Sequence, residues 1–282
     1  MYADLTDARC YYELIGTGDP LLLVPGLGAT CALWECVAAE LSNSFSLILP
    51  DNRGMGRSTS KRAPQTMADF AVDLVELLDH LQLKRVHVMG LSLGGIVAQQ
   101  LAVDHPGRID RLVLVSCTHR FGPYLREIAM LLAQALRHFP PELFRRTVEI
   151  LGSSPQYFDQ HAAEIDQKIA QTVETGFSRS AIAKQLRCLA RSDGTHDQDY
   201  RITAPTLVVA GDQDALIPAC YARQMANLIP DSEFVLLPEC GHNVFVEKPD
   251  VIVPLVTEFL MRSRPRKSRK TQDNQQAMEA SV

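Results

Sequence analysis

The fold of this chain is decided by residues 86–98, which read VHVMGLSLGGIVA. An apolar run over 86–89 indicates a buried strand, and a helical pattern begins at Leu93. Between them lies the pattern G-x-S-x-G, centred on Ser92. In this context the pattern predicts a nucleophilic serine on a strained strand-to-helix turn. We expect glycine at positions 90 and 94 because side chains two residues either side of the serine would collide there.

Short apolar runs alternate with helical patterns on both sides of this segment. The runs are too short and too continuously apolar for half-exposed strands, which predicts a parallel sheet covered on both faces. The predicted strands are Leu21–Val24, Ser46–Leu49, Val86–Met89, Leu112–Val115, Thr206–Ala210 and Phe234–Leu237, and the predicted helices span 30–41, 67–81, 93–103, 218–228 and 249–261. This order predicts an α/β fold with a doubly wound, mostly parallel sheet.

The alternation stops in the middle of the chain, where no convincing strand occurs. Four helices are predicted there, over 123–139, 141–151, 155–174 and 178–190. We therefore expect an α/β core over 1–118 and 201–261, an inserted all-helical cap over 119–200 and a basic tail over 262–282. The tail is poor in apolar residues, which predicts disorder.

The net charge is divided unevenly between the body and the tail. The chain carries a formal charge of −5 at pH 7, and its last 21 residues hold six basic and two acidic side chains, which leaves −9 on the body. An acidic body argues against the basic face that nucleic-acid binding requires. A short basic run is more often a solvated segment than a binding site. We expect no nucleic-acid partner.

The cysteine pattern and the apolar runs argue against metal, redox and membrane-spanning motifs. None of the seven cysteines forms a C-x-x-C pair, so zinc and redox motifs are unsupported. No apolar run reaches the ~18 residues of a membrane helix, and the first 20 residues lack a signal-peptide pattern. We expect a cytoplasmic monomer or homodimer with no membrane partner, no metal and no cofactor.

Four motifs in this order resemble the α/β-hydrolase fold superfamily, and in particular its serine hydrolases with a helical cap. They are PGLG at 25–28, DNRGMGRS at 51–58, the segment around Ser92, and GDQD at 211–214 followed by Gly241-His242. The resemblance covers nearly everything except the tail. Within the superfamily the layout is similar to that of esterases, 3-oxoadipate enol-lactonases and cofactor-free haloperoxidases.

The resemblance implies a catalytic triad of Ser92, Asp214 and His242. A serine hydroxyl is a poor nucleophile at neutral pH and needs a base within hydrogen-bond reach, for which His242 is the candidate. A carboxylate must then fix the imidazole tautomer and stabilise the imidazolium. The family's acid usually ends a G-x-x-D turn, which favours Asp214 and leaves Asp212 as its competitor.

The loop at 25–28 is the implied oxyanion hole, and it departs from the family pattern. The resemblance implies that the backbone N–H groups of Leu27 and Leu93 receive the oxyanion. The family often has histidine where this chain has Pro25, a position that shapes the loop and is outside the triad. Serine at position 92 argues against haloalkane dehalogenases and epoxide hydrolases, which use an aspartate there.

Plainer structural roles compete with some of these assignments. Ser92 would also suit a helix N-cap. Asp51 and Arg53 are expected to stabilise a turn rather than to take part in chemistry. Glu247 is expected to be a solvated charge, with support of the histidine loop as the alternative.

The predicted function is cleavage of a small carboxylic ester, lactone or thioester through an acyl-enzyme on Ser92. A C–C bond hydrolase or an enol-lactonase would use the same triad, and a non-catalytic receptor for a small molecule is the alternative from another class. The substrate is expected to be a small molecule with an apolar group under the cap. The residues expected to roof the pocket are Phe121, Tyr124, Leu125, Met130, Leu131, Leu132, Phe139, Phe144 and Tyr157.

Overall fold

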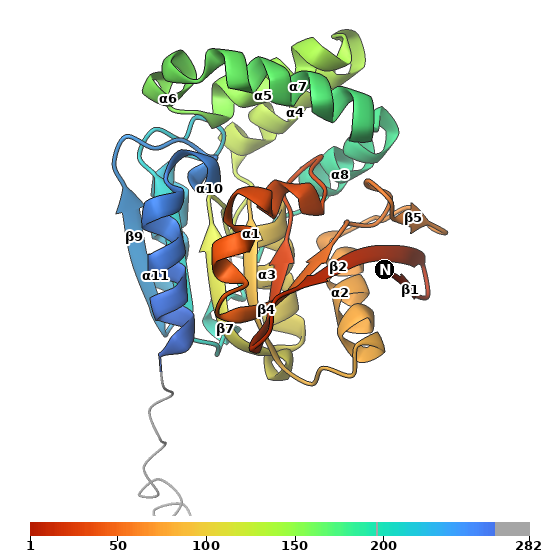
Figure 1. The fold of residues 1–282 in the computed structure, drawn as a ribbon, viewed down its shortest axis with the longest axis vertical. Coiled ribbons are helices and arrows are strands. Elements are labelled where there is room, and N and C mark those ends of the chain that lie inside the picture. Colours follow the sequence, from red (N-terminus) through yellow and green to blue (C-terminus); the bar gives the residue numbers. More distant parts are fainter. Residues whose placement is uncertain (196, 263–282) are drawn as a thin grey trace, which may run out of the picture.

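The structure, a computed structural model, describes residues 1–195 and 197–262. In these residues nine strands form one sheet in the order β1-β2-β4-β3-β6-β7-β8-β9, with β5 paired to β2 (Figure 1). The strands are β1 (Tyr2–Asp4), β2 (Ala8–Ile15), β3 (Asp19–Val24), β4 (Phe45–Pro50), β5 (Thr59–Ser60), β6 (Val86–Leu91), β7 (Ile109–Val115), β8 (Thr206–Gly211) and β9 (Ser232–Leu237). Neighbours from β4 to β9 are parallel, which confirms the predicted fold class.

The predicted strands are all present, but the antiparallel end of the sheet was not expected. There β2 pairs antiparallel with β1, β4 and β5. Along β2 the side chains of Ala8, Cys10 and Tyr12 are buried, whereas the intervening residues are more exposed. This period of two is the mark of a strand with one solvated face. It was present in the sequence and differs from the continuous apolar runs of the central strands.

The central strands are continuously apolar because each face of the sheet packs against helices. Along β3, Leu22 and Val24 belong to one hydrophobic core, whereas Leu21 and Leu23 belong to the other. Helices α2 (Met67–His80), α3 (Leu93–Asp104) and α9 (Ala219–Leu228) cover the first face, and η1 (Cys31–Trp34), α1 (Glu35–Leu41), α10 (Val244–Glu247) and α11 (Pro249–Met261) cover the second. The short 3₁₀ helices η2 (Pro106–Arg108) and η3 (Asp199–Arg201) lie in connections.

Five further helices form a layer over one end of the sheet (Figure 1). They are α4 (Pro123–His138), α5 (Pro141–Gly152), α6 (Pro155–Gln160), α7 (Ala162–Gly176) and α8 (Arg179–Arg191), called the helical insertion below. The prediction of one helix over 155–174 is wrong, since the chain breaks at His161 (φ −119°, ψ 20°) between α6 and α7. The His161 ring stacks on Tyr157 and its Nδ1 lies 2.7 Å from Glu164, with no proline or glycine to mark the break.

The chain enters and leaves the helical insertion through two adjacent segments. Arg120 and Gly194 form an antiparallel bridge, and the Thr195 N–H donates to the His119 carbonyl at 2.8 Å. These contacts support our proposed division near residues 119 and 200.

The predicted basic tail lies outside the described residues except for its first residue. In the part of the chain that is described, no helix combines the length and the apolar character needed to cross a membrane.

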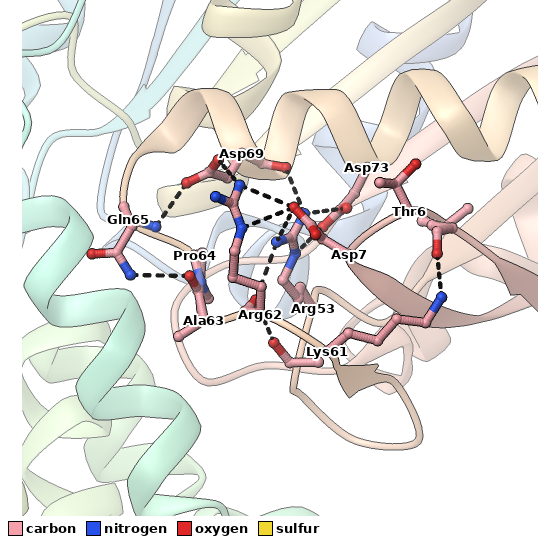
Figure 2. A network of polar contacts seen from close by, with 12 residues as sticks. Thr6, Asp7, Arg53, Lys61, Arg62, Ala63, Pro64, Gln65, Asp69 and Asp73 are labelled. Carbon is pink, nitrogen blue, oxygen red and sulfur yellow. Dashed lines mark hydrogen bonds and ion pairs between the residues drawn. The ribbon is translucent and has the colours of Figure 1, made fainter.

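The turn after β4 is anchored by a buried ion pair, drawn with its neighbours in Figure 2. Arg53 donates from Nε and Nη2 to the Asp73 carboxylate on α2, at 2.7 and 2.5 Å. Its Nη1 lies 3.6 Å from Asp7, and backbone carbonyls of Arg62 and Asp69 accept its other N–H groups. Because the Arg53 side chain is only 2% exposed, each of these partners offsets the cost of burying its charge. The five residues are called the Arg53 network below.

Asp51 binds the same turn to the segment that follows β3. Its two carboxylate oxygens accept the backbone N–H groups of Cys31 and Arg57, each at 2.8 Å. The side chains of Asp51 and Arg53 are thus both used to hold backbone and turn, which confirms their predicted structural role.

Candidate active site

The predicted nucleophile stands on a tight turn between β6 and α3. Ser92 has φ 56° and ψ −119°, a conformation that a residue with a side chain rarely adopts and that costs free energy. Ser92 occupies the N-cap position of α3, but its side chain makes no capping hydrogen bond, so the hydroxyl is not used to cap the helix. A strained turn with an uncommitted hydroxyl is typical of functional sites.

Two glycines allow this turn to form. A Cβ atom at Gly90 would lie 2.4 Å from the Gly94 carbonyl oxygen, and one at Gly94 would lie 2.0 Å from the Val24 carbonyl oxygen. Both distances are far inside van der Waals contact. The predicted collision of side chains two residues either side of Ser92 is confirmed.

His242 and Asp214 form a buried pair at the ends of two neighbouring segments. His242 Nδ1 lies 2.7 Å from Asp214 Oδ2, and the two side chains are 7% and 0% exposed. Asp214 Oδ1 accepts the backbone N–H groups of Leu216 and Ile217 at 2.9 and 2.8 Å, which fixes the carboxylate. An ionised carboxylate only accepts hydrogen bonds, so Nδ1 carries the proton and Nε2 keeps a lone pair. That lone pair is what a general base requires.

The two aspartates of the turn after β8 have different contacts. Asp214 binds His242, whereas Asp212 Oδ1 accepts the backbone N–H of Cys240 at 3.3 Å. Asp212 thereby supports the segment that leads to the histidine without touching its ring. The geometry favours Asp214 as the partner of the imidazole.

The loop after β3 packs directly against the serine turn. A Cβ atom at Gly26 would lie 3.5 Å from Ser92 Cβ, and the Pro25 carbonyl accepts the Asn52 amide at 3.1 Å. Leu27 lines the same cavity as Ser92. Leu93 is the first residue of α3, where backbone N–H groups have no helical partner and the helix dipole favours negative charge. The two predicted oxyanion donors therefore belong to segments that meet at Ser92.

A cavity of about 480 Å³ joins these groups, within the range of small-molecule sites. Ser92, His242 and the loop after β3 form its floor. The helical insertion supplies a mostly apolar roof consisting of Phe121, Leu125, Ile128, Ala129, Leu132, Phe144, Val148, Ile182, Leu186 and Leu189. Charged side chains also contribute to the wall, namely Glu35, Arg145, Glu149 and Lys168. The cavity can thus hold an apolar group beside the serine.

Part of the predicted roof is wrong. Phe121, Leu125, Leu132 and Phe144 line the cavity, but Tyr124, Met130, Leu131 and Phe139 are 37–64% exposed and do not line it, and neither does Tyr157. An apolar side chain on a helix can face inward or outward, and which side faces the core depends on tertiary packing.

The expectation that Glu247 is a solvated charge is also wrong. Its carboxylate accepts the backbone N–H of Gly241, beside His242, at 3.1–3.2 Å. It also accepts the N–H of Ser154, at the start of α6, at 3.2–3.3 Å. Next to it, Asn243 donates to the Glu149 carboxylate of α5 at 3.1 Å. The histidine loop is therefore fastened to the helical insertion, a contact that spans 93 residues of sequence.

Other reactive groups near the cavity are not suited to rival the serine. Burial raises the pKa of Cys31, which follows the loop after β3, to about 12, with Asp51 adding to the effect. Burial likewise raises the pKa of Cys240 to about 12. Such thiols stay protonated at neutral pH and are weak nucleophiles. Within residues 1–195 and 197–262, no group of three or more His, Cys, Asp or Glu side chains is placed to hold a metal ion.

Comparisons with known proteins agree with this geometry. A family model described as alpha/beta hydrolase fold matches residues 19–249. A protein of Variovorax paradoxus, RutD, whose name proposes carbamate hydrolysis, is 31% identical over 89% of this chain and 96% of its own. A hydrolase from Pseudomonas aeruginosa is 30% identical with a TM-score of 0.83, over 93% of this chain and 98% of its own. A thermophilic esterase from Thermogutta terrifontis is 29% identical with a TM-score of 0.83, over 92% and 98%.

Proposed function

This chain belongs to the α/β-hydrolase fold family and is a hydrolase, and we propose that it cleaves a small carboxylic ester, lactone or thioester through an acyl-enzyme on Ser92. One observation carries the proposal. Ser92, on its strained turn, and the buried His242–Asp214 pair line a single cavity whose remaining wall is mostly apolar.

Each proposed step uses a group already described. Ser92 Oγ attacks the substrate carbonyl carbon while His242 Nε2 takes its proton, and Asp214 stabilises the imidazolium. The backbone N–H groups of Leu27 and Leu93 receive the negative charge on the tetrahedral oxygen. Collapse expels the alcohol or thiol, which takes the proton from His242. A water molecule, deprotonated by His242, then attacks the acyl-enzyme and releases the acid.

The size and lining of the cavity favour an ester with an apolar acyl group over carbamate. The relatives named RutD are associated with carbamate hydrolysis by their names, and carbamate is among the smallest and most polar carbonyl compounds. A cavity of about 480 Å³ is much larger than such a molecule, and its roof of leucine, isoleucine, valine and phenylalanine suits an apolar acyl group better. The esterase at 29% identity supports the same choice.

The test is release of nitrophenol from p-nitrophenyl acetate, butyrate and hexanoate by the purified protein. We expect kcat/KM to rise from acetate to butyrate, because each added methylene buries more apolar area, about 0.8 kcal/mol per group. Ser92→Ala is expected to reduce kcat by about 10⁶-fold. Mass spectrometry of acid-quenched enzyme is expected to find the acyl group on the peptide that contains Ser92.

Ser116 offers a matched control on the neighbouring strand. It follows β7 as Ser92 follows β6, it also has a positive φ (47°), and it is fully buried away from the cavity. Ser116→Ala is expected to keep the wild-type kcat. Equal turnover by wild type and Ser92→Ala would refute the acyl-enzyme proposal. Binding of esters without turnover would favour the receptor alternative.

A further inference from the structure

The loop that carries the proposed oxyanion donor Leu27 is a tight turn over residues 26–29. The Ala29 N–H donates to the Gly26 carbonyl at 3.3 Å, and Gly28 has φ +66°. A positive φ at the third residue is the mark of a type II turn, which differs from type I by reversal of the central peptide. The central peptide here joins Leu27 to Gly28, so a contact to that peptide would favour one of its two orientations.

A side chain of the helical insertion makes that contact. Gln185, on α8, accepts the Gly28 N–H at its Oε1 atom at 2.8 Å, across 157 residues of sequence. Ile182, one turn earlier on α8, has atoms 3.1–3.2 Å from the point where a Cβ atom of Gly28 would lie. Helix α8 therefore packs against the turn and fixes its central peptide.

The amide nitrogen of Gln185 makes no hydrogen bond at this position. Gln185 is 1% exposed, and its Nε2 group is buried without a hydrogen-bond partner. A buried amide with an unsatisfied donor costs folding free energy, so a methionine of similar length would suit the site better for packing alone. The favourable contact of the side chain is with the loop.

We propose that Gln185 is a positioning residue for catalysis, which holds the Leu27–Gly28 peptide and thereby the turn that presents the Leu27 N–H to the oxyanion. The inference rests on the proposed function. The loop is held from the core by Asn52, which donates to the Pro25 carbonyl at 3.1 Å, and from the helical insertion by Gln185.

The experiment compares the wild type with Gln185→Met, which has a similar length but no oxygen to accept the Gly28 N–H. We expect Gln185→Met to lower kcat for p-nitrophenyl butyrate by about tenfold or more, because misplaced oxyanion donors cost about 10–1000-fold. KM is expected to stay within about twofold and Tm to be unchanged or higher, a split that a purely structural role would not produce. Exchange of the Gly28 amide hydrogen is expected to become faster, because the amide loses its acceptor.

Gln99 is the matched control, since it is a fully buried glutamine on α3 whose amide donates to the carbonyls of Gly95 and Thr118. Gln99→Met is expected to give the opposite pattern, with lower Tm and unchanged kcat per folded molecule. Wild-type kcat in Gln185→Met, or a loss only in proportion to unfolded protein, would overturn the inference. If the wild type releases no nitrophenol, the proposed function fails instead. In that case the positioning role is tested only by hydrogen exchange of the Gly28 amide. An unchanged exchange rate in Gln185→Met would overturn that role.

Discussion

The Arg53 network and the Asp214–His242 pair are two buried charged clusters with opposite surroundings. In the first, Arg53 is 2% exposed and each of its N–H groups described above has a carboxylate or carbonyl partner (Figure 2). A hollow beside it measures about 10 Å³. In the second, His242 is about as buried, but it lines a cavity of about 480 Å³ and its Nε2 is not committed to Asp214.

The difference shows that burial and short ion-pair distances do not by themselves mark a functional site. Both clusters have contacts of 2.5–2.7 Å and side chains almost hidden from solvent. The Asp214–His242 pair differs because it borders a cavity and because His242 Nε2 is not used in the contact with Asp214. We therefore expect changes in the Arg53 network to alter stability and changes in the Asp214–His242 pair to alter rate.

Among changes to these two clusters, the largest effect is expected from Asp214→Asn. The amide keeps the size of the carboxylate but would favour the wrong imidazole tautomer and would not stabilise the imidazolium. We expect kcat to fall about 10⁴-fold in the ester assay, with little change in Tm. Asp212→Asn, two residues earlier, is the control and is expected to retain near-wild-type kcat because Asp212 accepts the Cys240 N–H, whereas Asp214 holds the imidazole. Comparable losses in both variants would contradict the assignment of Asp214.

The next effect is expected from the Arg53 network, in stability rather than in rate. Arg53→Met would leave Asp73 buried without its cation, which costs about 3–5 kcal/mol in the free energy of unfolding. The double variant Arg53→Met/Asp73→Leu removes both charges and is expected to recover most of that loss. Urea unfolding measures both changes. A large fall of kcat in the stable double variant would show that this cluster also serves catalysis.

Sequence predicted the central strands and the motif residues because their signals are local. The strands buried on both faces appear as continuous apolar runs, and Ser92, Asp214 and His242 each stand in a short pattern at the end of a strand. Strand β2 was not predicted because one of its faces is solvated, so buried and exposed residues alternate along it. The helix break at His161 was not predicted because the sequence has no proline or glycine there.

The supporting contacts of the site could not be predicted in the same way. Glu247 and Ser154 are 93 residues apart, and Gln185 and Gly28 are 157 apart. No spacing rule connects such pairs, because each contact exists only once the helical insertion is packed on the core. The same reason explains why Met130 and Leu131 were expected in the roof and lie on the outside.

The smallest effect is expected at the partly exposed edge of the Arg53 network, where Asp69 caps α2. Burial raises the pKa of Asp69, but N–H bonds from Gln65 and Thr66 outweigh it, so the pKa is lowered. Ionisation then favours the folded state above the unfolded pKa near 4, and this stabilisation fades as pH falls through the lower folded pKa. Asp69→Asn should cost about 1 kcal/mol at pH 7 and progressively less toward pH 2. Urea unfolding at several pH values measures the difference in free energy of unfolding between the wild type and Asp69→Asn. The same difference at every pH would contradict the role of the Asp69 charge.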